Sequence, residues 1–213
     1  MLIGAATMKG ISLVLLLALG WPMTAAAQDR LPPIPPEKMT AEQRKAVEEF
    51  RAARNANVSG PFMALLRSPE VMNRARAMGD YLRFKSVFPS RLSEFAILIT
   101  ARHRTQNYEW VAHYQLALKG GLREDIARAV AEGRRPERMA EDEEILYNFC
   151  TELHQNKSVS DATYARMLKT FGEQGIIDAI GISGYYTLLA MVLNTARTPV
   201  PAGRAPGLAP FPR

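Results

Sequence analysis

The stretch Ser93–Gly121 constrains the fold more than any other part of the chain. Its first half contains the run FAILITA, which is apolar on all sides of a helix and therefore predicts a buried helix. A polar turn, Thr105–Asn107, separates this helix from a second one, Tyr108–Lys119, which Gly120-Gly121 ends in the usual manner of a C-cap. No strand-like alternation of polar and apolar residues is long enough to matter. The sequence therefore predicts an all-α fold.

Start and stop signals place further helices on both sides of this pair. Thr40 to Gln43 is a capping box, and Ser68-Pro69 is a typical helix start. The predicted helices are about Ala41–Arg54, Pro69–Phe84, Arg91–Arg104 with Ser90 as its cap, Arg123–Glu132, Glu141–Gln155, Asp161–Phe171 with Ser160 as its cap, and Gln174–Thr195, with a short apolar segment at Phe62–Leu66.

The two ends of the chain differ in composition from its middle. Residues 1–27 predict a cleaved signal peptide, because Lys9 precedes the apolar run Ile11–Trp21 and Ala25–Ala27 form a small-residue cleavage site. An uncleaved membrane anchor is the alternative. We expect a periplasmic or secreted protein with a Pro-rich arm without helix at 28–39, a helical domain at 40–197 and a Pro/Gly-rich tail at 198–213.

Charge and cysteine content exclude several classes of function. The 27 Lys and Arg residues exceed the 21 Asp and Glu residues by 6, but the positive charges are scattered, so nucleic-acid binding is not expected. Cys150 is the single cysteine, which excludes an internal disulfide and predicts a buried structural thiol.

The last predicted helix is apolar enough to raise the question of a membrane span. Asp178, Gly181, Gly184 and the adjacent Tyr185 and Tyr186 instead favour a helix in the core or at a subunit interface, where the glycines let another helix approach closely. We therefore expect no stable membrane insertion.

The ionisable residues of the central helix pair form a candidate site. Glu109 and His113 are four positions apart and share one helix face, Trp110 borders His113, and Glu94 lies in the first turn of the preceding helix. A carboxylate beside a histidine is a plausible proton-transfer pair. The alternatives are a helix-start carboxylate at Glu94 and a surface or structural pair at Glu109–His113.

The remaining histidines do not suggest a second site. His103 and His154 lie at predicted helix ends, where a cation suits the helix dipole, so we interpret both as structural. The spacing of the three histidines does not match a metal-binding motif, and no cofactor is expected.

Three blocks carry a family resemblance. They are Gly60-Pro61-Phe62 with Met78–Phe84 (MGDYLRF), Arg91–Leu122 and Gly175–Pro201, and the second contains the spacing E-x14-E-W-x-x-H from Glu94 to His113. In these blocks the chain resembles the carboxymuconolactone decarboxylase family, which shares the alkylhydroperoxidase D (AhpD)-like fold. The resemblance implies an AhpD-like helical domain that forms a homo-oligomer, commonly a trimer or hexamer, with sites near subunit interfaces.

The chain departs from this family's peroxidase branch at the catalytic thiols. That branch uses a Glu, a CxxC pair and a His, and here Glu94 and His113 match while Gln106 and Glu109 stand at the two cysteine positions. Peroxide reduction by a thiol pair is therefore not expected, whereas the resemblance to the decarboxylase branch remains. It assigns His113 and Glu94 to proton transfer and Glu109 to orienting His113.

The same resemblance suggests which residues bind a small substrate. We assign this role to Trp110, Tyr108 and Arg102, with Arg91 as another candidate for holding an anionic group. Tyr185 and Tyr186 are expected in the core or at an interface, with a pocket wall as the alternative. Three functions stay open: an exported lyase that performs acid–base chemistry on a small carboxylic acid or lactone, a peroxidase relative that lost its CxxC pair, and a non-enzymatic oligomer that binds a small ligand or a partner protein.

Overall fold

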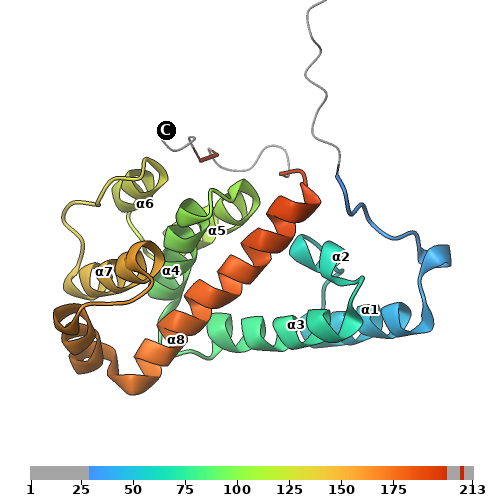
Figure 1. Ribbon diagram of the computed structural model, residues 1–213, viewed down its shortest axis with the longest axis horizontal. Helices are drawn as coiled ribbons and strands as arrows, with labels where there is room; N and C mark the ends of the chain where they lie inside the picture. The colour runs from blue at the N-terminus through green and yellow to red at the C-terminus, as the bar shows by residue number, and fades with distance from the viewer. Residues whose placement is uncertain (1–28, 201–206, 209–213) are drawn as a thin grey trace, which may run out of the picture.

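The computed structural model describes residues 29–200 and 207–208. Within these ranges the protein consists of eight α-helices and one 3-10 turn, with no strand, which confirms the predicted all-α fold (Figure 1). The helices are α1 (Ala41–Arg54), α2 (Pro61–Leu65), α3 (Pro69–Phe84), α4 (Ser90–His103), α5 (Asn107–Lys119), α6 (Glu124–Ala131), α7 (Glu141–Asn156) and α8 (Asp161–Ala196).

Helix α4 is the buried centre of the fold, as its apolar run predicts. It packs against α3, α5, α6, α7 and α8, and every residue from Leu92 to Arg102 is buried. Phe95 and Leu98 are fully excluded from solvent. Burial of one such side chain stabilises the fold by about 1.5–3 kcal/mol, so α4 organises the helices around it.

The local signals differ in how well they predicted the helix starts. Thr40 and Gln43 form the capping box of α1, and the Ser160 hydroxyl accepts a hydrogen bond from the Thr163 amide at the start of α8. Ser68 precedes α3 but makes no capping hydrogen bond through its side chain. The prediction that Ser90 caps α4 was wrong, because Ser90 is already helical and Pro89 occupies the cap position.

Helix α8 joins the two helices that were predicted for this part of the chain. Its backbone leaves helical geometry at Gly172, where φ is 69° and ψ is −179°. The helix continues beyond this kink and runs diagonally across the molecule beside α3, α4 and α2 (Figure 1). By length and composition alone it is long enough to cross a membrane, but 56% of its most apolar window is buried inside the described part of the protein.

The described parts of both ends pack on the helical domain. The Arg30 amide donates to the carbonyl of Ala196 at 2.7 Å, and residues 36–38 form a 3-10 turn, so the expectation that the arm has no helix holds only for α-helix. At the other end the Leu208 amide donates to Oδ1 of Asn107 at 2.6 Å. The signal peptide expected at 1–27 and most of the tail expected at 198–213 lie outside the described residues.

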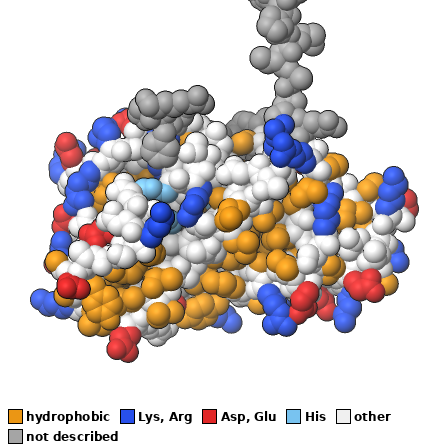
Figure 2. All heavy atoms as spheres, in the orientation of Figure 1, with side chains coloured by type: hydrophobic (Ala, Val, Ile, Leu, Met, Phe, Trp, Pro, Cys, Tyr) orange, Lys and Arg blue, Asp and Glu red, His pale blue; other side chains and the backbone are white. Residues whose placement is uncertain are grey.

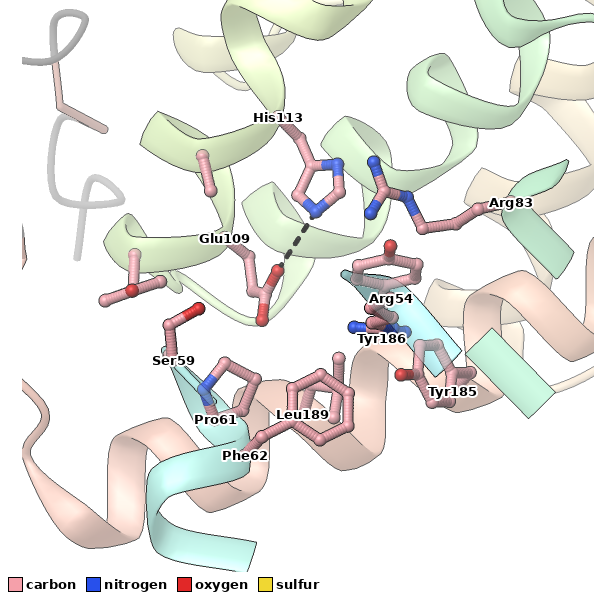
Figure 3. Close-up of a pocket in the computed structure, with 13 residues that line it drawn as sticks. Arg54, Ser59, Pro61, Phe62, Arg83, Glu109, His113, Tyr185, Tyr186 and Leu189 are labelled. Atoms are coloured by element: carbon pink, nitrogen blue, oxygen red, sulfur yellow. Dashed lines mark ion pairs between the residues drawn. The ribbon is translucent and has the colours of Figure 1, made fainter. Parts of the chain in front are cut away.

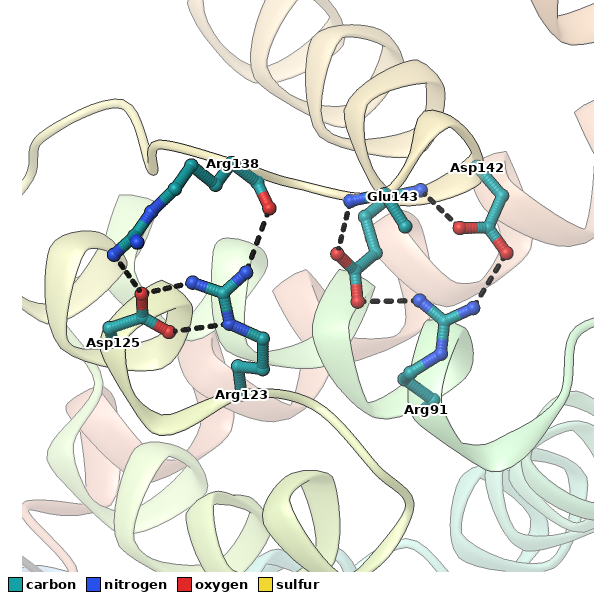
Figure 4. A network of polar contacts seen from close by, with 7 residues as sticks. Arg91, Arg123, Asp125, Arg138, Asp142 and Glu143 are labelled. Atoms are coloured by element: carbon teal, nitrogen blue, oxygen red, sulfur yellow. Dashed lines mark hydrogen bonds and ion pairs between the residues drawn. The ribbon is translucent and has the colours of Figure 1, made fainter.

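A cluster of ion pairs ties α4 to the segment before and inside α7 (Figure 4). Arg91 donates to Asp142 at 2.6 Å and to Glu143 at 2.5 Å, and Glu143 is buried. Glu143 also accepts the amide of Ala140 at 2.8 Å. Arg91 therefore holds two helices together and lies among carboxylates, which argues against the role in binding an anion that the sequence suggested for it.

Candidate active site

The fold brings Glu94, Glu109 and His113 into direct contact. Nδ1 of His113 lies 2.5 Å from Oε2 of Glu94, and its Nε2 lies 3.4 Å from Oε2 of Glu109. The three side chains are at most 8% exposed. The imidazole is therefore held between two buried carboxylates, one from α4 and one from the preceding turn of its own helix.

This geometry favours the charged form of the histidine. Burial by itself would lower the pKa of His113, but the contacts with Glu109 and Glu94 outweigh burial and raise the pKa above its ordinary value of 6.5. The ring of Tyr186 meets the imidazole edge-on, with 5.0 Å between ring centroids. Burial also raises the pKa of Tyr186 well above its ordinary range, so its hydroxyl stays neutral and can donate a hydrogen bond.

A cavity of about 200 Å³ opens beside His113 (Figure 3). Its walls come from the end of α1, the start of α2, the end of α3, the first turns of α5 and the middle of α8. They are formed by Arg54, Ser59, Gly60, Pro61, Phe62, Arg83, Tyr108, Glu109, Ala112, His113, Tyr185, Tyr186 and Leu189.

Glycines shape two sides of this cavity. Gly60 has φ of 58° where the chain enters α2, and a β-carbon there would lie 3.2 Å from two atoms of the Tyr108 ring and hydroxyl. Gly79 of α3 lies directly beneath the Tyr185 side chain, where a larger residue would collide with the phenol group. Both positions let a tyrosine lie close to the backbone of another element.

The two carboxylates differ in their access to the cavity. Glu109 lines it together with His113, and Figure 3 shows the Glu109–His113 ion pair at its wall, whereas Glu94 is not among the lining residues. The sequence assigned Glu94 to proton transfer and Glu109 to orienting His113. The contact at Nδ1 with Glu94 is the shorter of the two, and the longer contact at Nε2 with Glu109 lies at the cavity wall, which is the reverse of the arrangement that this assignment implies.

Of the three residues expected to bind substrate, one lines the cavity beside His113 and two do not. Tyr108 lines the cavity. Trp110 does not, because it is fully buried and packs against Tyr114 with 5.8 Å between ring centroids. Arg102 lies near the other end of α4 and lines a separate cavity of about 50 Å³. Neither Trp110 nor Arg102 is placed to bind a molecule beside His113.

Sequence reasoning missed the two arginines of the cavity and offered a pocket wall only as the alternative for the two tyrosines. Arg54 and Arg83 lie on α1 and α3, outside the stretch Ser93–Gly121, and no spacing pattern marks them as site residues. Tyr185 and Tyr186 are buried, as expected, and they also form a wall of the cavity. The sequence pointed to these cavity residues only indirectly. Arg83 belongs to the segment MGDYLRF, and Tyr185 and Tyr186 belong to Gly175–Pro201; both segments carry the family resemblance.

The positions that resemble redox cysteines have other roles here. The Gln106 side chain accepts a hydrogen bond from the Tyr108 amide at 2.6 Å as the cap of α5 and donates to Asn194 at 2.7 Å.

The single cysteine of the chain lies elsewhere. Cys150 is fully buried on α7, 3.8 Å from the Ser183 hydroxyl, as the sequence predicted for a structural thiol. Burial raises the pKa of its thiol to about 12, so the reactive thiolate is strongly disfavoured.

The other two histidines stack on each other at the ends of α4 and α7. Their ring centroids are 5.0 Å apart, and Nε2 of His154 lies 3.0 Å from the Thr100 hydroxyl. Burial, with the charges of His103 and Arg104, lowers the pKa of His154 to about 4. Burial and the two flanking arginines also lower the pKa of His103. The expectation that both act as cations at helix ends was therefore wrong, although both are structural.

Within residues 29–200 and 207–208, no group of three or more His, Cys, Asp and Glu side chains is arranged to hold a metal ion. The cavity instead offers an imidazolium, a carboxylate, two guanidinium groups and phenol hydroxyls. These groups can bind an anionic organic molecule and move a proton at an atom that lies beside Nε2 of His113.

The chain has the AhpD-like fold. It superimposes on the AhpD core of a peroxidase-related protein from Ralstonia eutropha with a TM-score of 0.65 and 15% identity, over 81% of this chain and 92% of that one. It superimposes on the debrominase Bmp8, solved with 2,3,4-tribromopyrrole, with a TM-score of 0.64 and 9% identity, over 84% and 95%. An AhpD-related protein from Agrobacterium tumefaciens gives 0.54 and 17%, over 65% and 95%. No protein-family model and no curated sequence matches the chain.

Proposed function

We propose that the protein is an acid–base enzyme of the carboxymuconolactone decarboxylase type, a lyase that acts on a small carboxylic acid or lactone. The observation that carries this proposal is the His113 imidazole, which is held between Glu94 and Glu109 at the wall of a cavity. Two buried carboxylates maintain a proton on the ring, and a proton donor beside a cavity is what protonation of a substrate carbon requires.

Each of the three side chains has its own role in the proposed reaction. Glu94 fixes the ring through Nδ1 and stabilises the imidazolium, while Nε2 of His113 donates its proton to the reacting carbon. In a decarboxylation the bond to the departing carboxylate breaks, its electron pair moves into the adjacent unsaturated system as a dienolate, and CO2 leaves. The carbon then takes the proton from Nε2, and Glu109 assists the return of a proton from solvent to the ring.

The test is hydrogen exchange and CO2 release from a panel of small carboxylic acids and lactones in D2O. For a substrate found in this way, His113→Ala and Glu94→Gln should each lower kcat by about 100-fold or more, in the range typical of general acid–base groups. His154→Gln is the matched control, because His154 is a partly buried histidine outside the cavity. Unchanged turnover in both site variants would show that the proposed site is wrong.

Thiol peroxidase chemistry is the competing proposal from the same resemblance. It requires a reactive cysteine, and Cys150 is fully buried with a strongly raised pKa and does not line the cavity. A non-enzymatic ligand carrier is the other alternative. It predicts that a ligand binds in the cavity while no carbon–hydrogen exchange occurs with any acid or lactone tested.

We also propose that the protein is a homo-oligomer, a trimer or hexamer, whose interface includes the outer face of α8. Ile177, Ile180, Leu188 and Met191 are between 39% and 65% exposed and lie on one face with Gly184. Met78 and Phe84 of α3, a helix that packs against α8, are also exposed, and Figure 2 shows hydrophobic side chains gathered on this face of the molecule.

A second copy of the chain is the occupant that this face fits. Gly184 has open space around it, so a partner helix can approach its backbone closely. Light scattering should give a defined oligomer for the wild type and a smaller species for Ile177→Lys/Met191→Lys. Leu116→Lys, on an exposed residue of α5, is the control. A monomeric wild type at micromolar concentration contradicts this proposal.

We propose, finally, that residues 1–27 direct export to the periplasm or the medium. Expression of the full chain in a bacterium, followed by fractionation and sequencing of the amino terminus, tests this. A protein beginning at Gln28 outside the cytoplasm supports export, and an unprocessed protein in the membrane supports the alternative of an anchor.

A further inference from the structure

Arg83 has hydrogen-bonding capacity that the described part of the chain does not use. It lies in the last turn of α3 and lines the cavity, and its side chain is 24% exposed. One terminal nitrogen lies 3.4 Å from Oε1 of Glu94, which is a long contact for an ion pair. Its Nε is buried, with no hydrogen-bond partner among residues 29–200 and 207–208. A buried guanidinium donor without an acceptor is costly, and a bound anion would supply the acceptor.

The other arginine of the cavity is already engaged. Nε of Arg54 donates to Asp80 at 2.8 Å. Its guanidinium also lies over two aromatic rings, 5.1 Å from the centroid of Phe50 and 4.7 Å from that of Phe62. Arg54 therefore forms part of the cavity wall. Arg83 also lies over a ring, 5.0 Å from the centroid of Phe84, but its Nε has no acceptor among the described residues, so it can still bind an anionic partner.

The position of Arg83 suits an anchoring role. Figure 3 shows its guanidinium beside the His113 ring, and both groups contact the carboxylate of Glu94. Burial opposes its charge, but Tyr186 and Glu94 outweigh burial and raise its pKa, so the group is a permanent cation. A guanidinium presents parallel N–H donors that match the two oxygens of a carboxylate.

The size and lining of the cavity restrict the rest of the ligand. Phe62, Tyr108, Tyr185 and Tyr186 give it aromatic walls, and its volume is about 200 Å³. An apolar protein cavity of about 150 Å³ is enough for benzene. The space beside His113 therefore accommodates one small ring with one short substituent.

We propose that Arg83 is the specificity-determining residue of this cavity and binds the carboxylate of a single-ring carboxylic acid, with the ring against the aromatic walls. The inference rests on the proposed function of the same site. The carboxylate on Arg83 is one that the substrate keeps, because an ion pair stabilises the charge that decarboxylation must disperse into the ring. The reacting carbon then lies on the side of the ring that faces Nε2 of His113.

Calorimetric titration with benzoate, and with benzamide as its neutral isostere, tests the inference. The wild type should bind benzoate at least tenfold more tightly than benzamide. Arg83→Gln should weaken benzoate binding by about 10- to 100-fold and leave benzamide binding unchanged. Arg74→Gln is the matched control, because it makes the same substitution on an exposed arginine of α3. Arg83→Lys should restore part of the preference for benzoate.

The wild-type comparison keeps the test valid if Arg83→Gln does not fold. Equal binding of the two probes, no benzoate binding at millimolar concentration, or benzoate binding that is unchanged in a folded Arg83→Gln variant would each overturn the inference. Failure of the proposed function looks different: Arg83-dependent benzoate binding persists while no acid or lactone shows turnover that depends on His113. That result would support carboxylate binding by Arg83 and contradict the proposed enzymatic activity.

Discussion

Oε2 of Glu94 lies 2.5 Å from Nδ1 of His113, although the two residues are 19 positions apart and belong to different helices. This contact joins α4 to α5 and orients the imidazole toward the cavity. Glu94→Gln keeps the shape of the side chain and removes its charge. We expect it to lower the pKa of His113, measured by NMR titration of the ring, and to destabilise the protein by about 1–3 kcal/mol. An unshifted His113 titration would contradict this account of the site.

The raised pKa of His113 predicts a pH dependence of stability. Because the folded-state pKa lies above the ordinary value of 6.5, the stabilisation is fully present below pH 6.5 and is lost as the pH rises through the folded-state pKa. Urea denaturation at a series of pH values should show this loss on the alkaline side. In His113→Gln this alkaline loss of stability should be absent. If the wild type and the variant show the same dependence of unfolding free energy on pH, the predicted contribution of His113 is wrong.

His154 predicts the opposite dependence. Its pKa is lowered to about 4, so between pH 6.5 and pH 4 the unfolded chain binds a proton that the native protein does not. Stability should therefore fall as the pH falls through this window, and His154→Gln should make the fall shallower. NMR should place the midpoint of the His154 titration near pH 4; a midpoint near 6.5 would mean that the stacked pair is open to water.

Two glycines of α8 should respond to alanine with opposite signs. Neither has an atom near the position of an added β-carbon, so their backbones decide the outcome. Gly172→Ala places a side chain at φ of 69° and ψ of −179°, a region that costs non-glycine residues about 1–3 kcal/mol. Gly184→Ala, in a regular part of the helix, should be neutral or stabilising by up to about 1 kcal/mol when both forms carry the interface substitutions Ile177→Lys/Met191→Lys. Thermal unfolding of the two variants provides the comparison.

The burial of Cys150 predicts an inert thiol. With a pKa of about 12 it should resist alkylation by iodoacetamide in the native protein at pH 8 and react once the protein is unfolded in urea. Cys150→Ser should leave turnover of a carboxylic acid or lactone substrate unchanged. Peroxide turnover by the purified wild type that persists in Cys150→Ser would revive a peroxidase function without thiols.

The extent of each helix followed from local signals with few errors. The all-round apolar run of α4, the Thr40–Gln43 capping box and the break near Gly172 act over a few residues, so the sequence alone identifies them. Ser90 was misassigned because Pro89 already has the extended backbone of a cap residue. The difference is one residue and does not alter the packing.

The site followed from the sequence only where it depends on spacing along one helix. Glu109 and His113 are one turn apart, so their contact was predictable, and the resemblance added Glu94. The arginines were not predictable. Arg83 and Arg102 both lie near the end of a predicted helix, so the sequence does not distinguish them. Arg83 lines the cavity beside His113 because α3 packs against α8, whereas Arg102, near the end of α4, lines a different cavity.

By itself the sequence determined the helical class, the buried centre at α4 and the carboxylate–histidine pair on α5, because helix periodicity and capping are properties of neighbouring residues. The tertiary structure alone decided which carboxylate faces the cavity, that Trp110 belongs to the core, and that Arg54 and Arg83 meet Tyr185 and Tyr186 beside His113. These relationships depend on how five helices cross, and crossing is set by the packing of side chains that are distant in sequence.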